Sequence, residues 1–154
     1  MLKRTLSKKI GELLIERGII NVDQLGVALE RQKQQGGYIS QHLISLKYAS
    51  ESEIALCISN QYNFAYLPLK HYSITPDILK LIPLKWIMIY TLIPVDKIGR
   101  VLSIVMADPL NEGVIRMLEE ITNCEVQVFI STYSEIKQAI SQYYSAELQK
   151  MQDF

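Results

Sequence analysis

The most restrictive feature of this sequence is an internal repeat near its N-terminus. Residues Lys9–Gln32 and Tyr38–Gln61 align without a gap when 29 is added to each number of the first segment. Any two amphipathic helical hairpins share apolar spacing, but here the capping signals and the final glutamine also coincide, which favours a true duplication. The matching pairs are Ile10/Ile39, Leu14/Leu43, Ile15/Ile44, Leu25/Ile54, Leu29/Ile58 and Gln32/Gln61.

Each repeat is predicted to form a short helix, a turn and a capped longer helix. In the first repeat, Gly18 stands where a helix would end in the left-handed conformation. Asn21 and Gln24 form a capping box that opens the longer helix, and Ser50 and Glu53 form the same box in the second repeat. The N-terminal part of the chain is therefore expected to contain helices only.

Beyond the repeats, the pattern changes from helical periodicity to strands. Leu92–Ile98 and Val101–Ala107 flank the pair Gly99-Arg100 and predict a β-hairpin, and Glu125–Ile130 alternates as a further strand. Residues 62–68 suggest an extended link or edge strand. Helices are expected over 75–81 with Thr75 as N-cap, over 84–90, after a cap at Asp108-Pro109, and from Tyr133 to Tyr144 or beyond.

The predicted fold class is α+β. It consists of an all-helical N-terminal lobe of two repeated helical hairpins, followed by a small α+β lobe with a roughly three-stranded sheet. The expected domain limits are 1–62 for the helical lobe, which contains the motifs 9–32 and 38–61. The α+β lobe is expected over 63–145, and 146–154 is expected to be a tail or linker.

Composition argues against several classes of protein. The 154 residues are 49% hydrophobic and 21% charged, which supports a packed core rather than disorder. Sixteen basic and sixteen acidic side chains cancel, which disfavours a nucleic-acid binder or a polybasic membrane-surface protein. No apolar run approaches the ~18–20 residues that span a bilayer. We expect a cytoplasmic protein in which Cys57 and Cys124 are buried free thiols.

No catalytic or metal-binding set emerges from the sequence. The phosphate loop of P-loop NTPases is absent, and so are GxGxxG, GxSxG and HExxH. His42 and His71 have no ligand partner at helical spacing, and both are expected at the surface or its boundary. The sequence therefore predicts neither an enzyme nor a metal site.

The repeat resembles the N-terminal domain of type II secretion and type IV pilus assembly ATPases, the MshEN-like family. In the subtype that binds cyclic di-GMP, two 24-residue motifs are separated by five residues, as are 9–32 and 38–61 here. A later stretch, with Met106–Leu110, Ile140 and Tyr143-Tyr144, is similar to the second subdomain of the family. The resemblance covers the chain from about residue 8 to residue 144.

The resemblance implies a cyclic di-GMP site across the helical lobe. Lys9 stands where an arginine could stack on guanine, and Gly11 would let backbone N–H groups approach the ligand. In the second motif, Tyr38 can stack on a base but carries no charge, and Ser40 adds a side chain at the position of Gly11. The implied contact residues are Lys9, Ile10, Gly11, Leu14, Gly18, Ile19, Gln32, Tyr38, Ile39, Ser40, Leu43 and Gln61.

The first motif is nearly intact, whereas the second is altered at its polar and glycine positions. Lys47 replaces Gly18, which costs on the order of 1 kcal/mol if the same turn is kept. The aliphatic positions would be core with or without a ligand, so they do not discriminate. We therefore favour a domain kept for protein contacts over one kept for nucleotide binding.

By resemblance, the predicted function is that of a non-catalytic regulatory or interaction domain. Its partner would be the cytoplasmic part of an inner-membrane platform protein of a secretion or pilus machine. The alternative is a cyclic di-GMP sensor with a degenerate second motif, and a stand-alone adaptor is a third reading. No cofactor is expected other than cyclic di-GMP as ligand, and neither nucleic acid nor direct membrane insertion is expected. The predicted location is cytoplasmic, peripheral to the inner membrane through the partner.

Overall fold

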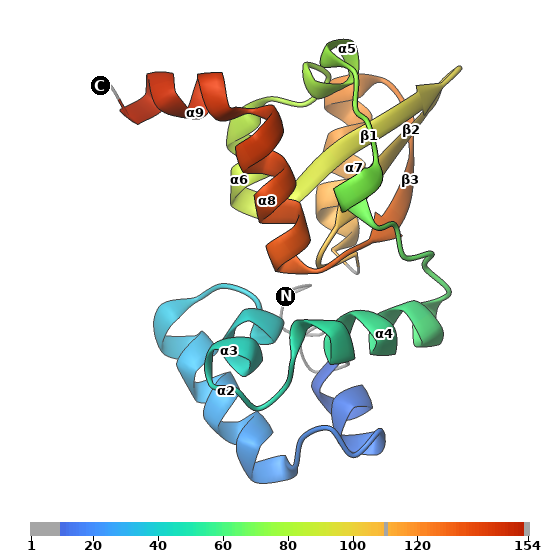
Figure 1. Ribbon diagram of the computed structural model, residues 1–154. Helices are drawn as coiled ribbons and strands as arrows, with labels where there is room; N and C mark the ends of the chain where they lie inside the picture. The colour runs from blue at the N-terminus through green and yellow to red at the C-terminus, as the bar shows by residue number, and fades with distance from the viewer. Residues whose placement is uncertain (1–9, 110, 153–154) are drawn as a thin grey trace. The chain divides into compact units, whose positions relative to one another are not determined.

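A computed structural model describes residues 10–109 and 111–152 of the chain (Figure 1). The chain divides into two compact units, Met1–Asn63 and Phe64–Phe154. The fold class predicted from the sequence is confirmed, because the second unit contains a three-stranded mixed sheet with helices and the described part of the first unit is helical. That each unit folds by itself, as the predicted domain limits imply, stays a prediction.

The first unit repeats one arrangement of helices twice. Both longer helices begin with the capping boxes predicted from the sequence. Asn21 Oδ1 accepts a hydrogen bond from the Gln24 N–H at 2.8 Å, and Ser50 Oγ accepts one from the Glu53 N–H at 3.1 Å. The helices are a first one described over 10–16, α2 (Val22–Gln35), α3 (Ile39–Ser45) and α4 (Glu51–Tyr62).

The turn inside each repeat has the same backbone hydrogen bonds. The N–H of Ile19 donates to the Leu14 carbonyl at 2.9 Å, and the pair 29 residues later does so at 3.0 Å. Gly18 has a φ of 72° and Lys47 a φ of 61°, so the lysine keeps the left-handed conformation of the first repeat. The repeated hairpins are therefore confirmed in backbone geometry as well as in sequence.

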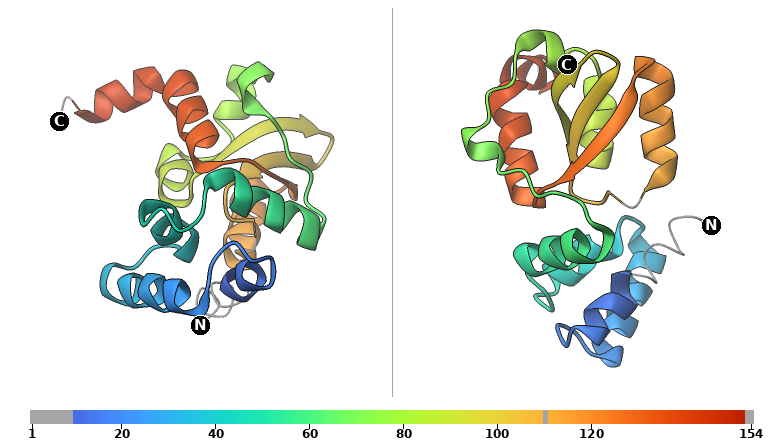
Figure 2. Two further views of the ribbon diagram at one scale, coloured as in Figure 1. Left: turned by 60° about the horizontal axis from the view of Figure 1, so that its bottom comes forward. Right: turned by 90° about the vertical axis from the view of Figure 1, so that its right-hand side faces the viewer.

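The second unit is built on a sheet of order β1-β2-β3 (Figure 1). Strands β1 (Leu92–Ile98) and β2 (Val101–Met106) form the predicted antiparallel hairpin around Gly99-Arg100, and Gly99 has a φ of 59°. Strand β3 (Glu125–Ile130) runs parallel to β2, which requires a crossover connection. Helices α7 (Glu112–Thr122) and α8 (Tyr133–Tyr143) lie on opposite faces of this sheet, so both faces are covered (Figure 2).

Helix α7 (Glu112–Thr122) makes the crossover and begins later than predicted. Its N-cap is Asn111, whose Oδ1 accepts a hydrogen bond from the Val114 N–H at 3.4 Å. The predicted cap at Asp108-Pro109 was wrong, because these residues lie before the N-cap, in the connection that follows β2. Asparagine and aspartate are both good N-caps, so local preference does not decide between Asn111 and Asp108.

The segment that enters the second unit runs beside β3 and along α8 (Tyr133–Tyr143). Tyr66 forms an isolated bridge with Ile130, so the predicted extended link is present as a single bridge. Tyrosine hydroxyl groups hold this segment to α8: Tyr66 donates to Glu135, and Tyr143 donates to the Tyr72 carbonyl at 2.7 Å. Hydrogen bonds between residues about 70 positions apart make the segment part of this unit's core structure.

Short helices complete the second unit. The helix predicted over 75–81 is shorter in the structure than predicted, since it ends at Leu79. The side chain of Thr75, the predicted N-cap, makes no capping hydrogen bond. The helix after α8 follows a break at Tyr144, whose hydroxyl donates to the Leu79 carbonyl at 2.7 Å. The remaining elements are η1 (Leu69–His71), α5 (Pro76–Leu79), α6 (Leu84–Tyr90) and α9 (Ser145–Gln152).

Candidate functional site

The residues predicted to contact cyclic di-GMP separate into two groups by burial. The aliphatic side chains of the short helices belong to the core, and Leu14 and Leu43 are both 0% exposed. Ile10 and Ile39 are buried as well. Lys9 lies outside the described residues. The predicted contact residues that are at least partly exposed are Gly18, Ile19, Gln32, Tyr38 and Gln61.

Gly11 has a packing role that its sequence position did not reveal. It is buried in the first helix, and a Cβ added there would lie 2.5 Å from Leu25 Cδ1 in α2. The missing side chain therefore lets the two helices of the first repeat approach each other closely. Ser40, at the same position of the second repeat, is also buried and has a partner within the protein. Neither residue presents a side chain to the surface.

The loop between the repeats is held by side chains of both flanking helices. Gln32 Nε2 donates to the Gly37 carbonyl at 3.0 Å, and His42 Nε2 lies 2.7 Å from the Gly36 carbonyl oxygen. Because a carbonyl oxygen only accepts, His42 carries its proton on Nε2 in this contact. His42 was expected at the surface or its boundary, but it is only 9% exposed and ties α3 to the loop.

Tyr38 and Gln61, the remaining polar positions of the motifs, lie in different settings. Tyr38 is the half-buried N-cap of α3, and its N–H donates to Gln41 Oε1 at 3.3 Å. Gln61 is exposed near the end of α4. The structure thus brings Gln32 and Tyr38 to the same loop. Gln32 binds the carbonyl of Gly37, and Tyr38 directly follows Gly37 in the chain. Nothing in the described part of the chain joins Gln61 to that loop.

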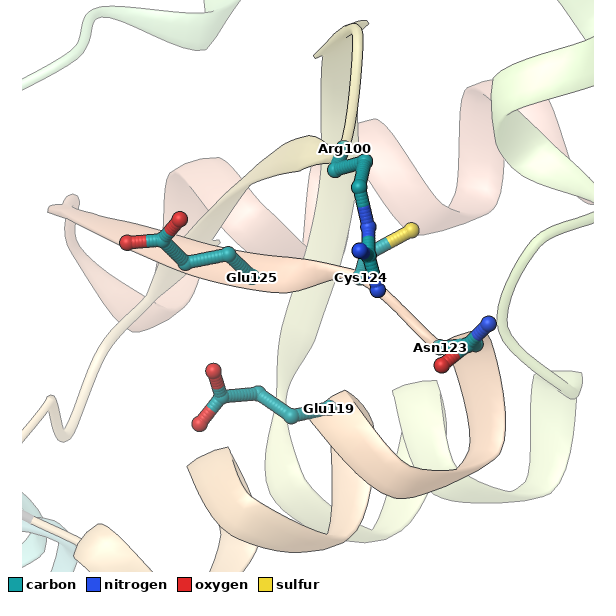
Figure 3. Close-up of a pocket in the computed structure, with 5 residues that line it drawn as sticks. All are labelled: Arg100, Glu119, Asn123, Cys124 and Glu125. Carbon is teal, nitrogen blue, oxygen red and sulfur yellow. The ribbon is translucent and has the colours of Figure 1, made fainter.

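The second unit has a polar surface hollow of about 330 Å³ beside the hairpin turn (Figure 3). Its glutamates are partly used by the fold, since Glu119 Oε2 accepts from the Val126 N–H at 3.4 Å. One cation, Arg100, shares this hollow with the two carboxylates Glu119 and Glu125. The lining residues are Arg100, Glu119, Asn123, Cys124 and Glu125.

Three further properties of the described residues concern metal binding, membrane crossing and the cysteines. Within 10–109 and 111–152, no cluster of three or more histidine, cysteine, aspartate or glutamate side chains could hold a metal ion. No helix in those same ranges is long and apolar enough to cross a membrane. Cys57 and Cys124 are buried free thiols, as predicted. Burial raises the pKa of the Cys57 thiol above its ordinary value, and Arg17 nearby partly offsets this.

Comparison with known families decides the identity. A family model described as the MshEN domain matches residues 62–150, which is more than half of the chain. The chain belongs to the MshEN domain family. The match covers the second unit, from the last residue of α4 into α9, whereas the repeated motifs precede it.

Two curated relatives extend the similarity of this MshEN protein to the repeats. The type IV pilus assembly ATPase PilB of Myxococcus xanthus is 30% identical over 148 residues, which are 96% of this chain and 26% of that protein. The PilB of Thermus thermophilus is 25% identical over 139 residues, 89% of this chain and 16% of that protein. The chain therefore spans about a quarter of the length of these relatives, or less.

Solved structures of other proteins share the fold of this chain. The structure of MshE with cyclic di-GMP has a TM-score of 0.70 at 25% identity, over 88% of this chain and 98% of that one. The N-terminal domain of XpsE has a TM-score of 0.78 at 20% identity, over 90% of this chain and 96% of that one. At that identity the XpsE likeness shows the fold alone.

Proposed function

We propose that this MshEN domain is a non-catalytic interaction domain of a type IV pilus or type II secretion ATPase. It docks onto the cytoplasmic part of an inner-membrane platform protein, and it is peripheral to the inner membrane through that partner. The observation that carries the proposal is the coverage of M. xanthus PilB, where 96% of this chain matches only 26% of the relative. A segment of that proportion corresponds to one domain of a larger machine.

Some polar side chains of the motifs are used by the fold itself rather than left for a ligand. Gln32 and His42 hold the loop between the repeats, and Ser40 is buried. Of the five polar side chains in the predicted contact set, Gln32 and Ser40 therefore have partners within the protein. No phosphate loop of the P-loop type occurs in the sequence, so we expect the purified chain to hydrolyse no ATP above the buffer background.

A binding measurement tests the interaction function. The purified chain is titrated by calorimetry with the cytoplasmic part of the platform protein from the same organism. We expect saturable binding with a dissociation constant at about the micromolar level or below, about 8 kcal/mol of binding free energy. Absence of binding at the highest attainable concentrations, or ATP turnover by the chain alone, contradicts the proposal.

Cyclic di-GMP binding is a second candidate function, favoured by the MshE structure with that nucleotide. Tyr38 is half-buried at the start of α3, beside the loop that Gln32 holds. If the nucleotide stacks there, Tyr38→Arg should strengthen binding by about 1–3 kcal/mol, because it adds a planar fork for the guanine edge. Lys9→Ala should weaken binding, most at low salt, because screening of the phosphate attraction is weakest there.

The test of this second function is calorimetric titration of cyclic di-GMP into the wild type and both variants. Saturable binding that responds to both substitutions supports a sensor. Equal affinities for all three proteins contradict a site at these residues, and an absence of binding in all three leaves the repeats with a packing role.

A further inference from the structure

Helix α6 presents an apolar and aromatic outer face. Ile87 is fully buried and anchors the helix, whereas Met88 and Ile89 are 45% and 59% exposed. The half-buried rings of Trp86 and Tyr90 stack with centroids 6.0 Å apart and planes inclined by 19°. Aromatic residues and methionine are enriched at protein interfaces, and tryptophan and tyrosine are frequent energetic anchors there. The pre-stacked pair would lose little conformational entropy on binding.

Helix α6 itself carries a positive charge and no negative charge. The Nζ of Lys85 lies 4.7 Å from the centre of the Trp86 ring, in a cation–π contact. Within α6, Lys85 is the charged residue, and its side chain is exposed. A surface that covers α6 with good complementarity must therefore supply carboxylates around an apolar centre.

A second copy of the chain does not meet this requirement. A two-fold contact through α6 brings the same patch of each copy together. Lys85 of each copy would then lie in one contact, and α6 has no aspartate or glutamate that could pair with it. Such juxtaposition of like charges disfavours association. The complementary surface is therefore that of a different protein.

We propose that the outer face of α6 is the docking surface of this domain, and that its partner presents an amphipathic helix with acidic residues beside aliphatic ones. A helix is the fitting shape, because the side-chain ridges of α6 pack into the grooves of another helix. The inference rests on the interaction function proposed above and adds the surface and the partner's chemistry to it. Met88 and Ile89 fill the apolar centre, and Lys85 meets the carboxylates.

The experiment compares three variants of the full chain in the titration with the cytoplasmic part of the platform protein. Ile89→Asp places a carboxylate in the apolar centre and should weaken binding at least tenfold. Lys85→Glu should weaken binding severalfold and reduce its dependence on ionic strength. Ile98→Asp is the matched control, because Ile98 is a 75% exposed isoleucine at the hairpin of the same unit. This control variant should bind the partner as tightly as the wild type does. Thermal unfolding of each variant checks that the fold is unchanged.

Each other outcome overturns the inference in a distinct way. Wild-type binding that Ile89→Asp leaves unchanged removes α6 as the docking surface while the interaction function stands. Absence of wild-type binding removes both. A wild-type dimer in light scattering that Ile89→Asp converts to a monomer reassigns the face to a second copy. Cosedimentation with phosphatidylglycerol vesicles that the same variant abolishes reassigns it to a lipid surface.

Discussion

In the first helical repeat the residue after the opening isoleucine is Gly11, and in the second repeat it is Ser40. The first position has no room for a Cβ because Leu25 fills it, whereas the second accommodates the buried side chain of Ser40. The turn and the helix caps are nevertheless the same in both repeats. Turns and caps depend on backbone hydrogen bonds, so they persist while the packing between helices changes.

A second pair of equivalent positions also differs in its buried side chains while the backbone stays the same. Leu13 and His42 are equivalent and both buried, but only His42 carries a polar ring, which reaches the Gly36 carbonyl. The second repeat therefore uses one core position to hold the loop that joins it to the first. Duplicated backbones can thus keep one geometry while their buried side chains take on different tasks.

The largest effect is expected from the matched core leucines. Leu14→Ala and Leu43→Ala each remove a fully buried side chain, and each should lower the free energy of unfolding by about 2–5 kcal/mol. Urea unfolding of the two variants measures both values. If one variant loses less than about 1 kcal/mol, its repeat is not packed as described.

Exchange of the small residues sharpens the packing difference. Gly11→Ser should destabilise the chain by about 1–3 kcal/mol, because the new Cβ collides with Leu25. Leu25→Ala should remove most of this penalty, so the two substitutions should couple in a double-mutant cycle. The matched change Ser40→Gly should not couple to Leu25→Ala. Additive effects of Gly11→Ser and Leu25→Ala would show that the glycine has no close-packing role.

Exchange of the turn residues tests the shared backbone. Lys47→Gly should stabilise the chain by up to about 1 kcal/mol, because Lys47 has a φ of 61° that glycine adopts without a Cβ penalty. Gly18→Lys should destabilise it by about the same amount, since nothing crowds the Cβ position and only the backbone conformation matters. Melting temperatures that move in the same direction for both variants would contradict a common turn.

The smallest effect concerns Cys57, which occupies the position of Ala28 in the first repeat. Burial raises the pKa of this thiol in the folded chain. The stability that the buried neutral thiol contributes is therefore fully present below the pKa of about 8.5 that the thiol has in the unfolded chain. It decreases as the pH rises above that value, because only the unfolded chain then loses the proton. Cys57→Ala should therefore make stability fall less steeply between about pH 8 and pH 10. Parallel pH profiles for the two proteins would show that the thiol is not buried.

Features with a local physical cause were predicted from the sequence. The capping boxes at Asn21 and Ser50 need partners only three residues away, and the left-handed turn at Gly18 needs only its own helix end. The hairpin around Gly99-Arg100 joins strands through two residues. The likeness of the two repeats identified Lys47 as the position where a kept turn would be unfavourable, and the structure shows that the turn is kept.

Features that depend on distant partners appeared only in the tertiary structure. The role of Gly11 depends on Leu25 in another helix, and no sequence window shows that the two meet. The burial of His42 depends on a carbonyl in the loop before its helix. The choice of Asn111 over Asp108 as helix cap likewise depends on how the chain leaves β2. For the site, the sequence named the motif positions, but packing decided which of them reach the surface, because burial is a property of the folded chain and not of the motif.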